Sequence, residues 1–182
     1  MRFDSPSEGI WTINVYGRNL TTGQYDIWID NREFINNDTY FVISDPYTTV
    51  TNPANVPECI AVAAYDHKDN SLYLRNGRGY NSDGIIKPDF AAPGVDILVP
   101  DNSGATGFVR RSGSSIATAF TAGAAALLQE YGSGNMRIMT TPVIKNILIS
   151  GCGRKQGLIY PNREWGYGTL NLYNSIDNLR RG

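Results

Sequence analysis

Histidine is nearly absent from this chain, whose 182 residues include one histidine and two cysteines. Two cysteines are too few for a disulfide framework, and Cys59 and Cys152 lack the spacing of a zinc site. Cys59 begins the apolar run 59–64, so we interpret it as a small core residue. Cys152 lies between two glycines and its state is left open. The composition therefore predicts no cofactor or metal centre within this chain.

A strong charge of either sign and a long apolar run are also missing. The formal net charge is −1, and the basic residues cluster only as the short pairs 110–111 and 180–181. This argues against nucleic acid as a partner. No apolar run approaches the roughly 20 residues that cross a bilayer, which predicts no membrane span. The first residues have no apolar signal-peptide core, as expected of a chain cut from a longer protein.

The first 46 residues have a β-type pattern. Aromatic and β-branched residues alternate in strand fashion over 10–17, 25–29 and 39–43, with a turn cluster at 19–23. Such alternation predicts three half-buried strands. Three strands make a poor independent fold. We therefore interpret residues 1–46 as the tail of a β-sandwich or jelly-roll module.

Residues 47–182 have the pattern of an α/β domain. The continuous apolar run 60–65 predicts a strand buried on both faces, and a Pro-Gly turn at 93–94 leads to a second strand at 95–99. Helices are predicted over residues 115–131, stopped by Gly132 and Gly134, and over 142–150 and 171–180.

Ser115 stands where a short Gly/Ser turn becomes a helix rich in small residues. The first N–H groups of a helix have no intrahelical partner, and the dipole there favours negative charge. A hydroxyl at this place can attack a carbonyl and leave the oxyanion facing N–H donors. The alternative interpretation is structural: Ser112, Ser114 or Ser115 could be an N-cap, and the alanines could let the helix lie close to a sheet.

Four motifs surround Ser115 in a defined order. Residues 49–64 form an apolar strand with its lead-in, followed by Asn-Gly-Arg-Gly at 76–79 and Lys-Pro-Asp-Phe-Ala-Ala-Pro-Gly at 87–94. The fourth is Trp-Gly-Tyr-Gly-Thr-Leu-Asn at 165–171, and Ser115 itself lies between them in Gly-Ser-Ser-Ile-Ala at 113–117. Over about residues 47–178 the chain closely resembles the subtilases, the subtilisin-like serine proteases. The resemblance implies the C-terminal part of a subtilisin-like α/β domain with a parallel sheet.

The resemblance also implies roles for individual residues. Ser115 would be the acyl-enzyme nucleophile, with its own backbone N–H as one oxyanion donor. Ser114 stands where the family has threonine and would support the oxyanion site. Thr51, Asn52 and Ala54 would line the wall of the pocket for the side chain before the scissile bond. The implied substrate is a polypeptide, and the implied activity is that of a serine endopeptidase.

The chain departs from the family pattern in two places. Ile116 replaces the usual methionine, and Ala119-Phe120 stands where the family typically has Pro-His, so the helix start is expected to pack differently. The β segment before the subtilase strand resembles the Csp-type proteases of clostridial spore germination. In these a jelly-roll module interrupts the protease domain between the catalytic histidine and serine. This resemblance implies an extracellular, cell-envelope or spore-associated location.

Three of the four catalytic groups of the family are expected upstream of this chain, because subtilases run Asp, His, oxyanion Asn, then Ser. The chain's own substitutes are weak: His67 in a polar turn, Asp89 and Asp96 around a Pro-Gly turn, and Asn52 and Asn76 as oxyanion donors. In subtilisin, a member of this family, loss of the serine or histidine alone lowers kcat by about 10⁶. We therefore expect this chain alone to be inactive, with the missing N-terminal part of the same protein as its partner.

Three alternatives remain beside an active protease. The first is a pseudoprotease subunit that acts as a binding or signalling partner in a protease cascade. The second is a nucleophile elbow of an α/β-hydrolase, which needs a histidine downstream of the serine, where none occurs. The third is carbohydrate binding by Trp11, Tyr25 and Trp28, set against a core role. Calcium is expected only in the full-length protein, by family analogy, because residues 66–70 are too short and basic for a ligand loop.

Overall fold

The helices and strands of the described residues all lie in the second of two compact units, residues 1–44 and 45–182. The structure is a computed structural model that describes residues 7–23, 25–29, 35–36, 38–102, 104 and 107–181. The elements are β1 (Val62–Tyr65), β2 (Phe90–Pro93), β3 (Ile97–Pro100), β4 (Phe108–Arg111), α1 (Ser114–Gly134), α2 (Thr141–Ser150) and α3 (Leu172–Arg181).

Strands β1 and β2 form a parallel pair that is covered on both faces. Their register pairs Val62 with Phe90 and Tyr65 with Pro93. Alternate residues face opposite sides: Ala64 packs with Ala117 of α1, whereas Ala63 packs with Trp165. Because both faces are buried, the strand sequences are continuously apolar rather than alternating. The strand predicted over residues 60–65 is confirmed as β1.

The segment after α2 adds a third line of backbone to this pair. The Ala91 N–H donates to the Gly168 carbonyl at 2.8 Å, and the Leu170 N–H donates to the Ala91 carbonyl at 2.7 Å. Thr169 forms a parallel bridge with Ala91. The closing motif at residues 165–171 therefore completes the sheet beside β2, and the predicted α/β class with a parallel sheet is confirmed.

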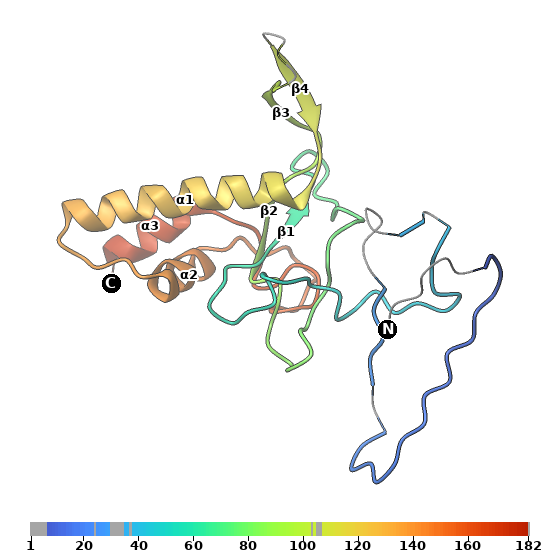
Figure 1. The fold of residues 1–182 in the computed structure, drawn as a ribbon. Helices are drawn as coiled ribbons and strands as arrows, with labels where there is room; N and C mark the ends of the chain where they lie inside the picture. Colours follow the sequence, from blue (N-terminus) through green and yellow to red (C-terminus); the bar gives the residue numbers. More distant parts are fainter. Residues whose placement is uncertain are drawn as a thin grey trace. The chain divides into compact units, whose positions relative to one another are not determined.

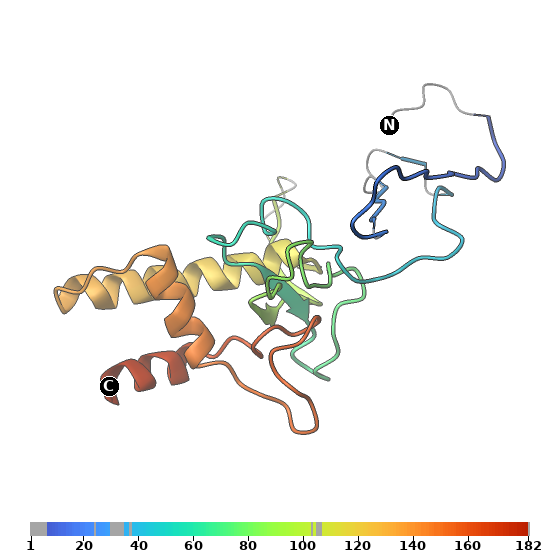
Figure 2. The same ribbon diagram turned by 90° about the horizontal axis from the view of Figure 1, so that it is seen from below.

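The three helices pack around one apolar core. Phe90 of β2 meets Ala124 and Leu128 of α1 and Ile144 and Leu148 of α2. Helix α1 contacts both strands of the parallel pair, and α3 packs against α2. Figures 1 and 2 show α2 and α3 lying together on one side of the long helix α1.

The structure corrects two predictions about the middle of the chain. A single strand was predicted over 95–99, but an antiparallel hairpin forms, in which Ile97 pairs with Arg111 and Pro100 with Phe108. Figure 1 shows this β3–β4 hairpin extending from the start of α1. Helix α1 also continues through Gly132 to Gly134. A Cβ on Gly132 would lie 2.4 Å from Met139 Cγ, so this glycine permits close packing and does not end the helix.

The three strands predicted over residues 10–17, 25–29 and 39–43 are not formed. In the described residues of 7–44 the structure assigns neither helix nor strand, and Ile10, Tyr16 and Ile43 are about nine-tenths exposed, at 91%, 89% and 93%. An alternating segment becomes a strand only when its backbone pairs with a neighbour and its apolar face is covered. The assignment of residues 1–46 to a jelly-roll module stays a prediction.

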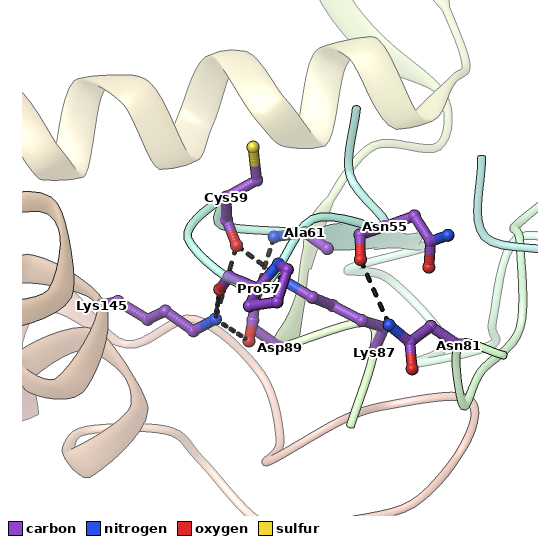
Figure 3. A network of polar contacts seen from close by, with 8 residues as sticks. All are labelled: Asn55, Pro57, Cys59, Ala61, Asn81, Lys87, Asp89 and Lys145. Carbon is purple, nitrogen blue, oxygen red and sulfur yellow. Dashed lines mark hydrogen bonds and ion pairs between the residues drawn. The ribbon is translucent and has the colours of Figure 1, made fainter. Parts of the chain in front are cut away.

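A buried carboxylate, Asp89, connects four segments of the second unit. Its Oδ2 accepts a hydrogen bond from the Ala61 N–H at 2.7 Å, just before β1. The Lys87 ammonium lies 3.2 Å from the same oxygen, and Lys145 of α2 lies 2.7 Å from Oδ1. The backbone carbonyl of Asp89 accepts from the Tyr167 N–H at 2.8 Å. Figure 3 shows both lysines converging on this one carboxylate.

The two lysines also bind the loop that precedes β1. The Lys87 ammonium donates to the Cys59 carbonyl at 2.7 Å, and Lys145 donates to the Pro57 carbonyl at 3.1 Å. The Lys87 and Asp89 side chains are 0% and 2% exposed, so the pair is fully buried. Burial lowers the pKa of Lys87, and the charge of Asp89 opposes that shift. Asp89 therefore has a structural role, because it neutralises two ammonium groups.

We predict that Asp89→Asn lowers the free energy of unfolding by about 3–5 kcal/mol, because it leaves two ammonium groups without a counter-charge. Lys87→Met should cost only about 1 kcal/mol, since Lys145 and the Ala61 N–H still satisfy the carboxylate. Urea denaturation of the purified variants measures both values.

Asp177→Asn is the matched control for this comparison. Asp177 forms an exposed ion pair with Arg181 at 2.7 Å on α3. Its loss should cost less than about 0.5 kcal/mol. Equal costs for Asp89→Asn and Lys87→Met would contradict the role given to Asp89.

Candidate active site

Ser115 lies in the first turn of α1, beside the carboxyl ends of the parallel strands. After β2 the chain turns at Gly94, whose N–H donates to the Tyr65 carbonyl at the end of β1, at 3.0 Å. After the hairpin, the Gly113 N–H donates back to the Gly94 carbonyl at 2.8 Å. Ligands of open parallel sheets bind at the carboxyl ends of the strands. The two glycines therefore place the serine turn at the edge of the sheet where chemistry is expected.

Close packing at Gly94 sets the position of the serine turn. A Cβ there would lie 2.7 Å from the Ala64 Cβ, 2.9 Å from the Gly113 carbonyl and 3.2 Å from the Ala117 Cβ. Contacts below 3.0 Å require a shift of the backbone or of a neighbour. Only glycine lets β1, the serine turn and α1 approach each other this closely.

The serine hydroxyls do not cap the helix. The N-cap is Gly113, and no side chain bonds to the first turn as a cap. Ser112 Oγ instead accepts a hydrogen bond from the Asp96 N–H at 2.9 Å. Ser114 and Ser115 are exposed, and among the described residues no partner bonds to the Ser115 hydroxyl. The capping interpretation is therefore wrong, and the Ser115 hydroxyl is available for chemistry.

The surroundings of Ser115 favour an anion. The first turn of α1 contains no acidic residue, and its N–H groups point out of the helix start. The Ile116 N–H is bonded to the Gly113 carbonyl at 3.1 Å, which leaves the N–H groups of Ser114 and Ser115 as donors. An oxyanion formed on a carbonyl attacked by Ser115 would meet these donors.

A base for Ser115 is not assembled by the described part of the chain. His67 is exposed in the turn after β1, and no hydrogen bond orients its ring among the described residues. A general base in a triad needs contact with the nucleophile and with a group that orients it. The structure thus leaves His67 as the solvated loop residue that its sequence context predicts.

The other predicted site residues lie before β1 or on its flank. Thr51 and Asn52 are exposed and Ala54 is half-buried in the loop that leads to β1. Asn76 is bound on both sides of its amide: Oδ1 accepts from the Ala64 N–H at 2.8 Å and Nδ2 donates to the Ala64 carbonyl at 2.7 Å. Asn76 therefore holds β1 and is not free to act as an oxyanion donor.

An apolar groove of about 640 Å³ begins at Ile116, the residue after Ser115. One wall is a stripe of α1 with helical spacing, and the other comes from β3. Phe120 and Leu127 on the stripe are 45% and 52% exposed, and Leu98 on β3 is 57% exposed. The neighbouring stripe of α1, with Ala124 and Leu128, packs on the core, so this helix is apolar on more than one face.

Cys152 lies half-buried just after α2. The Cys152 thiol donates to the Leu148 carbonyl at 3.3 Å, and burial raises its pKa to about 12. Cys152 is therefore a neutral thiol at physiological pH and is unreactive, because the thiolate is the reactive form.

Within the described ranges no group of three or more His, Cys, Asp or Glu residues could hold a metal ion. No helix in the same residues is long and apolar enough to cross a membrane.

These features agree with the comparisons with known proteins. The profile of the subtilase family matches residues 36–168, which is most of the chain. The chain belongs to the subtilase family, a family of serine proteases.

This chain is also similar to solved protease structures, among them those of CspB and PagA. The Clostridium perfringens CspB protease is 34% identical, with a TM-score of 0.74, and the match covers 79% of this chain and 32% of CspB. The prenylagaramide maturation protease PagA is 27% identical, with a TM-score of 0.61, and the match covers 74% of this chain and 47% of PagA. The predicted resemblance to the Csp type is confirmed by the first of these. The chain spans about a third of the length of CspB, and no curated protein sequence matches it.

We predict that Gly94→Ala lowers the free energy of unfolding by about 2 kcal/mol, because the added methyl group overlaps Ala64 and the Gly113 carbonyl. Gly123→Ala, in α1, is the control: nothing lies within 4 Å of the added Cβ. That variant should be more stable by about 0.5–1 kcal/mol, because alanine favours the helix. Thermal denaturation compares the two, and a neutral Gly94→Ala would contradict the close packing.

We also predict that Cys152 resists alkylation in the folded protein. At pH 8 a thiol with a pKa near 12 is almost entirely protonated. Iodoacetamide labelling followed by peptide mass mapping should modify Cys152 rapidly in urea and slowly without it. Equal rates in the two conditions would show that the thiol is accessible and ionised.

Proposed function

We propose that this chain carries the nucleophile of a serine endopeptidase, Ser115, and hydrolyses peptide bonds as part of a longer protein. The observation that carries the proposal is the placement of an exposed, uncapped serine in the first turn of α1, at the carboxyl edge of the parallel strands. Membership of the subtilase family supports the same assignment.

The chemistry that this arrangement supports is acyl transfer. Ser115 Oγ attacks the carbonyl carbon of the scissile peptide bond while its proton passes to a base. The carbonyl oxygen becomes an oxyanion beside the N–H of Ser115, and Ser114 supports the same place. Collapse of the tetrahedral intermediate expels the amine, which takes the proton, and water then releases the acyl group. Thr51, Asn52 and Ala54 would form the wall of the pocket for the preceding side chain.

Three further groups would come from the part of the same protein that lies N-terminal to this chain. They are the base, the residue that orients it and the oxyanion asparagine. His67 lies exposed in a turn and has no orienting partner among the described residues. The chain spans 32% of CspB, so a relative of this kind has room for these groups elsewhere. We therefore expect the chain alone to be inactive.

The apolar groove supports a partner that completes the domain. A helix that is apolar on several faces is normally buried on all of them. The stripe of Phe120, Gly123 and Leu127 borders the groove next to Ser115. A segment of the same protein that covers this groove would bury these side chains.

A pseudoprotease subunit is the second candidate. The observation that favours it is the single histidine, which lies in a solvated turn. If the longer protein lacks the catalytic Asp or His, the chain keeps the fold and serves as a binding or signalling partner in a protease cascade. The retained serine and its uncapped turn favour the enzyme instead.

Fluorophosphonate labelling read by intact-mass spectrometry tests the proposal. We expect the full-length protein to gain one label at Ser115 and the 182-residue chain to gain none. Loss of the serine or of its base reduces reactivity by about 10⁶, so the contrast between the two proteins should be complete.

Two serine variants act as controls. Ser115→Ala should abolish labelling of the full-length protein, whereas Ser114→Ala should slow it without moving the label. Labelling of the short chain would show that it contains its own base. An absence of label in the full-length protein would favour the pseudoprotease.

A further inference from the structure

Asp96 makes four contacts on the side of the serine turn that faces the hairpin. Its backbone N–H donates to Ser112 Oγ at 2.9 Å. Arg110 Nη1 donates both to the backbone carbonyl of Asp96 at 2.8 Å and to its carboxylate at 3.1 Å. The carboxylate also forms an ion pair with Lys68. Asp96 therefore makes hydrogen bonds through its main chain and ion pairs through its side chain.

These contacts join Asp96 to two other segments around the nucleophile, the turn after β1 and the stretch 110–112 that leads into α1. Lys68 belongs to the turn after β1, Arg110 to strand β4, and Ser112 to the turn that leads into α1. Asp96 itself follows the Pro-Gly turn after β2. Ser115 is three residues beyond Ser112, and the intervening Gly113 is bonded to Gly94. The backbone pairing of Ile97 with Arg111 and the bond of Gly113 to Gly94 restrain the serine turn from the same side, and the Asp96 contacts add side-chain restraints to them.

We propose that Asp96 is a positioning residue for Ser115, which fixes the serine turn by binding Ser112 through its main chain and Lys68 and Arg110 through its carboxylate. This inference rests on the proposed function, because it concerns the nucleophile of that reaction.

The backbone conformation explains why aspartate suits this place. Asp96 has a φ of +52°, in the left-handed region. Asp and Asn adopt this region more readily than other non-glycine residues. Asp96→Asn therefore keeps the backbone and the N–H to Ser112 while it removes the charge that binds Lys68 and Arg110. Ser112→Ala does the reverse, because it removes only the acceptor of the Asp96 N–H.

The test measures fluorophosphonate labelling rates and amide hydrogen exchange in the full-length protein. We expect Asp96→Asn and Ser112→Ala each to slow labelling of Ser115 about tenfold, since small displacements of a nucleophile cost this much or more. The Gly113 amide, which is bonded to Gly94, should exchange faster in both variants. Asp177→Asn, which removes an exposed ion pair with Arg181 on α3, should change neither measurement.

Salt dependence separates positioning by charge from a general loss of stability. Exposed ion pairs are screened at about 1 M salt. Labelling of the unmodified protein should therefore slow toward the rate of Asp96→Asn as salt is raised, while Asp96→Asn itself stays nearly constant. A double-mutant cycle with Lys68→Met should show that the two substitutions are not additive.

The outcomes distinguish this inference from the proposed function. If Ser115 is labelled normally in Asp96→Asn and the Gly113 amide is equally protected, Asp96 does not position the nucleophile, and the proposed function stands. If the unmodified protein takes no label, the proposed function fails. Hydrogen exchange then decides the structural part alone: unchanged protection of Gly113 in both variants overturns the inference, and faster exchange supports it.

Discussion

The fold of residues 45–182 depends on the buried charge of Asp89. This carboxylate binds the amide before β1 and two lysines, one of them on α2, while its backbone binds the closing segment at Tyr167. Without this carboxylate, two ammonium groups would be left without a counter-charge. Asp89 thereby sets the relative position of the strands, of α2 and of the loop that contains the predicted pocket wall.

The position of Ser115 follows from the placement of these strands through hydrogen bonds between backbone groups. Once β1 and β2 are aligned, Gly94 binds Tyr65 and Gly113 binds Gly94, so the start of α1 is placed at the carboxyl edge. Among the described residues no partner accepts from the N–H groups of Ser114 and Ser115, and unused donors are what an oxyanion site needs. The packing of two glycines thus determines where Ser115 lies.

The parts of the fold that could be predicted are those with local causes. These parts are strand β1 and helices α1, α2 and α3, whose residue patterns are visible in the sequence. The structure places their starts within two residues of the predicted positions and their ends within three. The β3–β4 hairpin was missed because its second strand, Phe108–Arg111, is short and exposed, with no alternation that marks it. The strands predicted before residue 44 did not form because no neighbouring strand pairs with them in the described residues.

The sequence by itself determined the family, the nucleophile candidate and the class of fold, because these depend on residue types at fixed spacing. Only the tertiary structure decided that the serines do not cap α1, that Asn76 is committed to β1 and that Asp96 reaches Ser112, Lys68 and Arg110. The physical reason is that each of these depends on which groups meet across long separations in the chain. Local residue patterns do not specify those contacts.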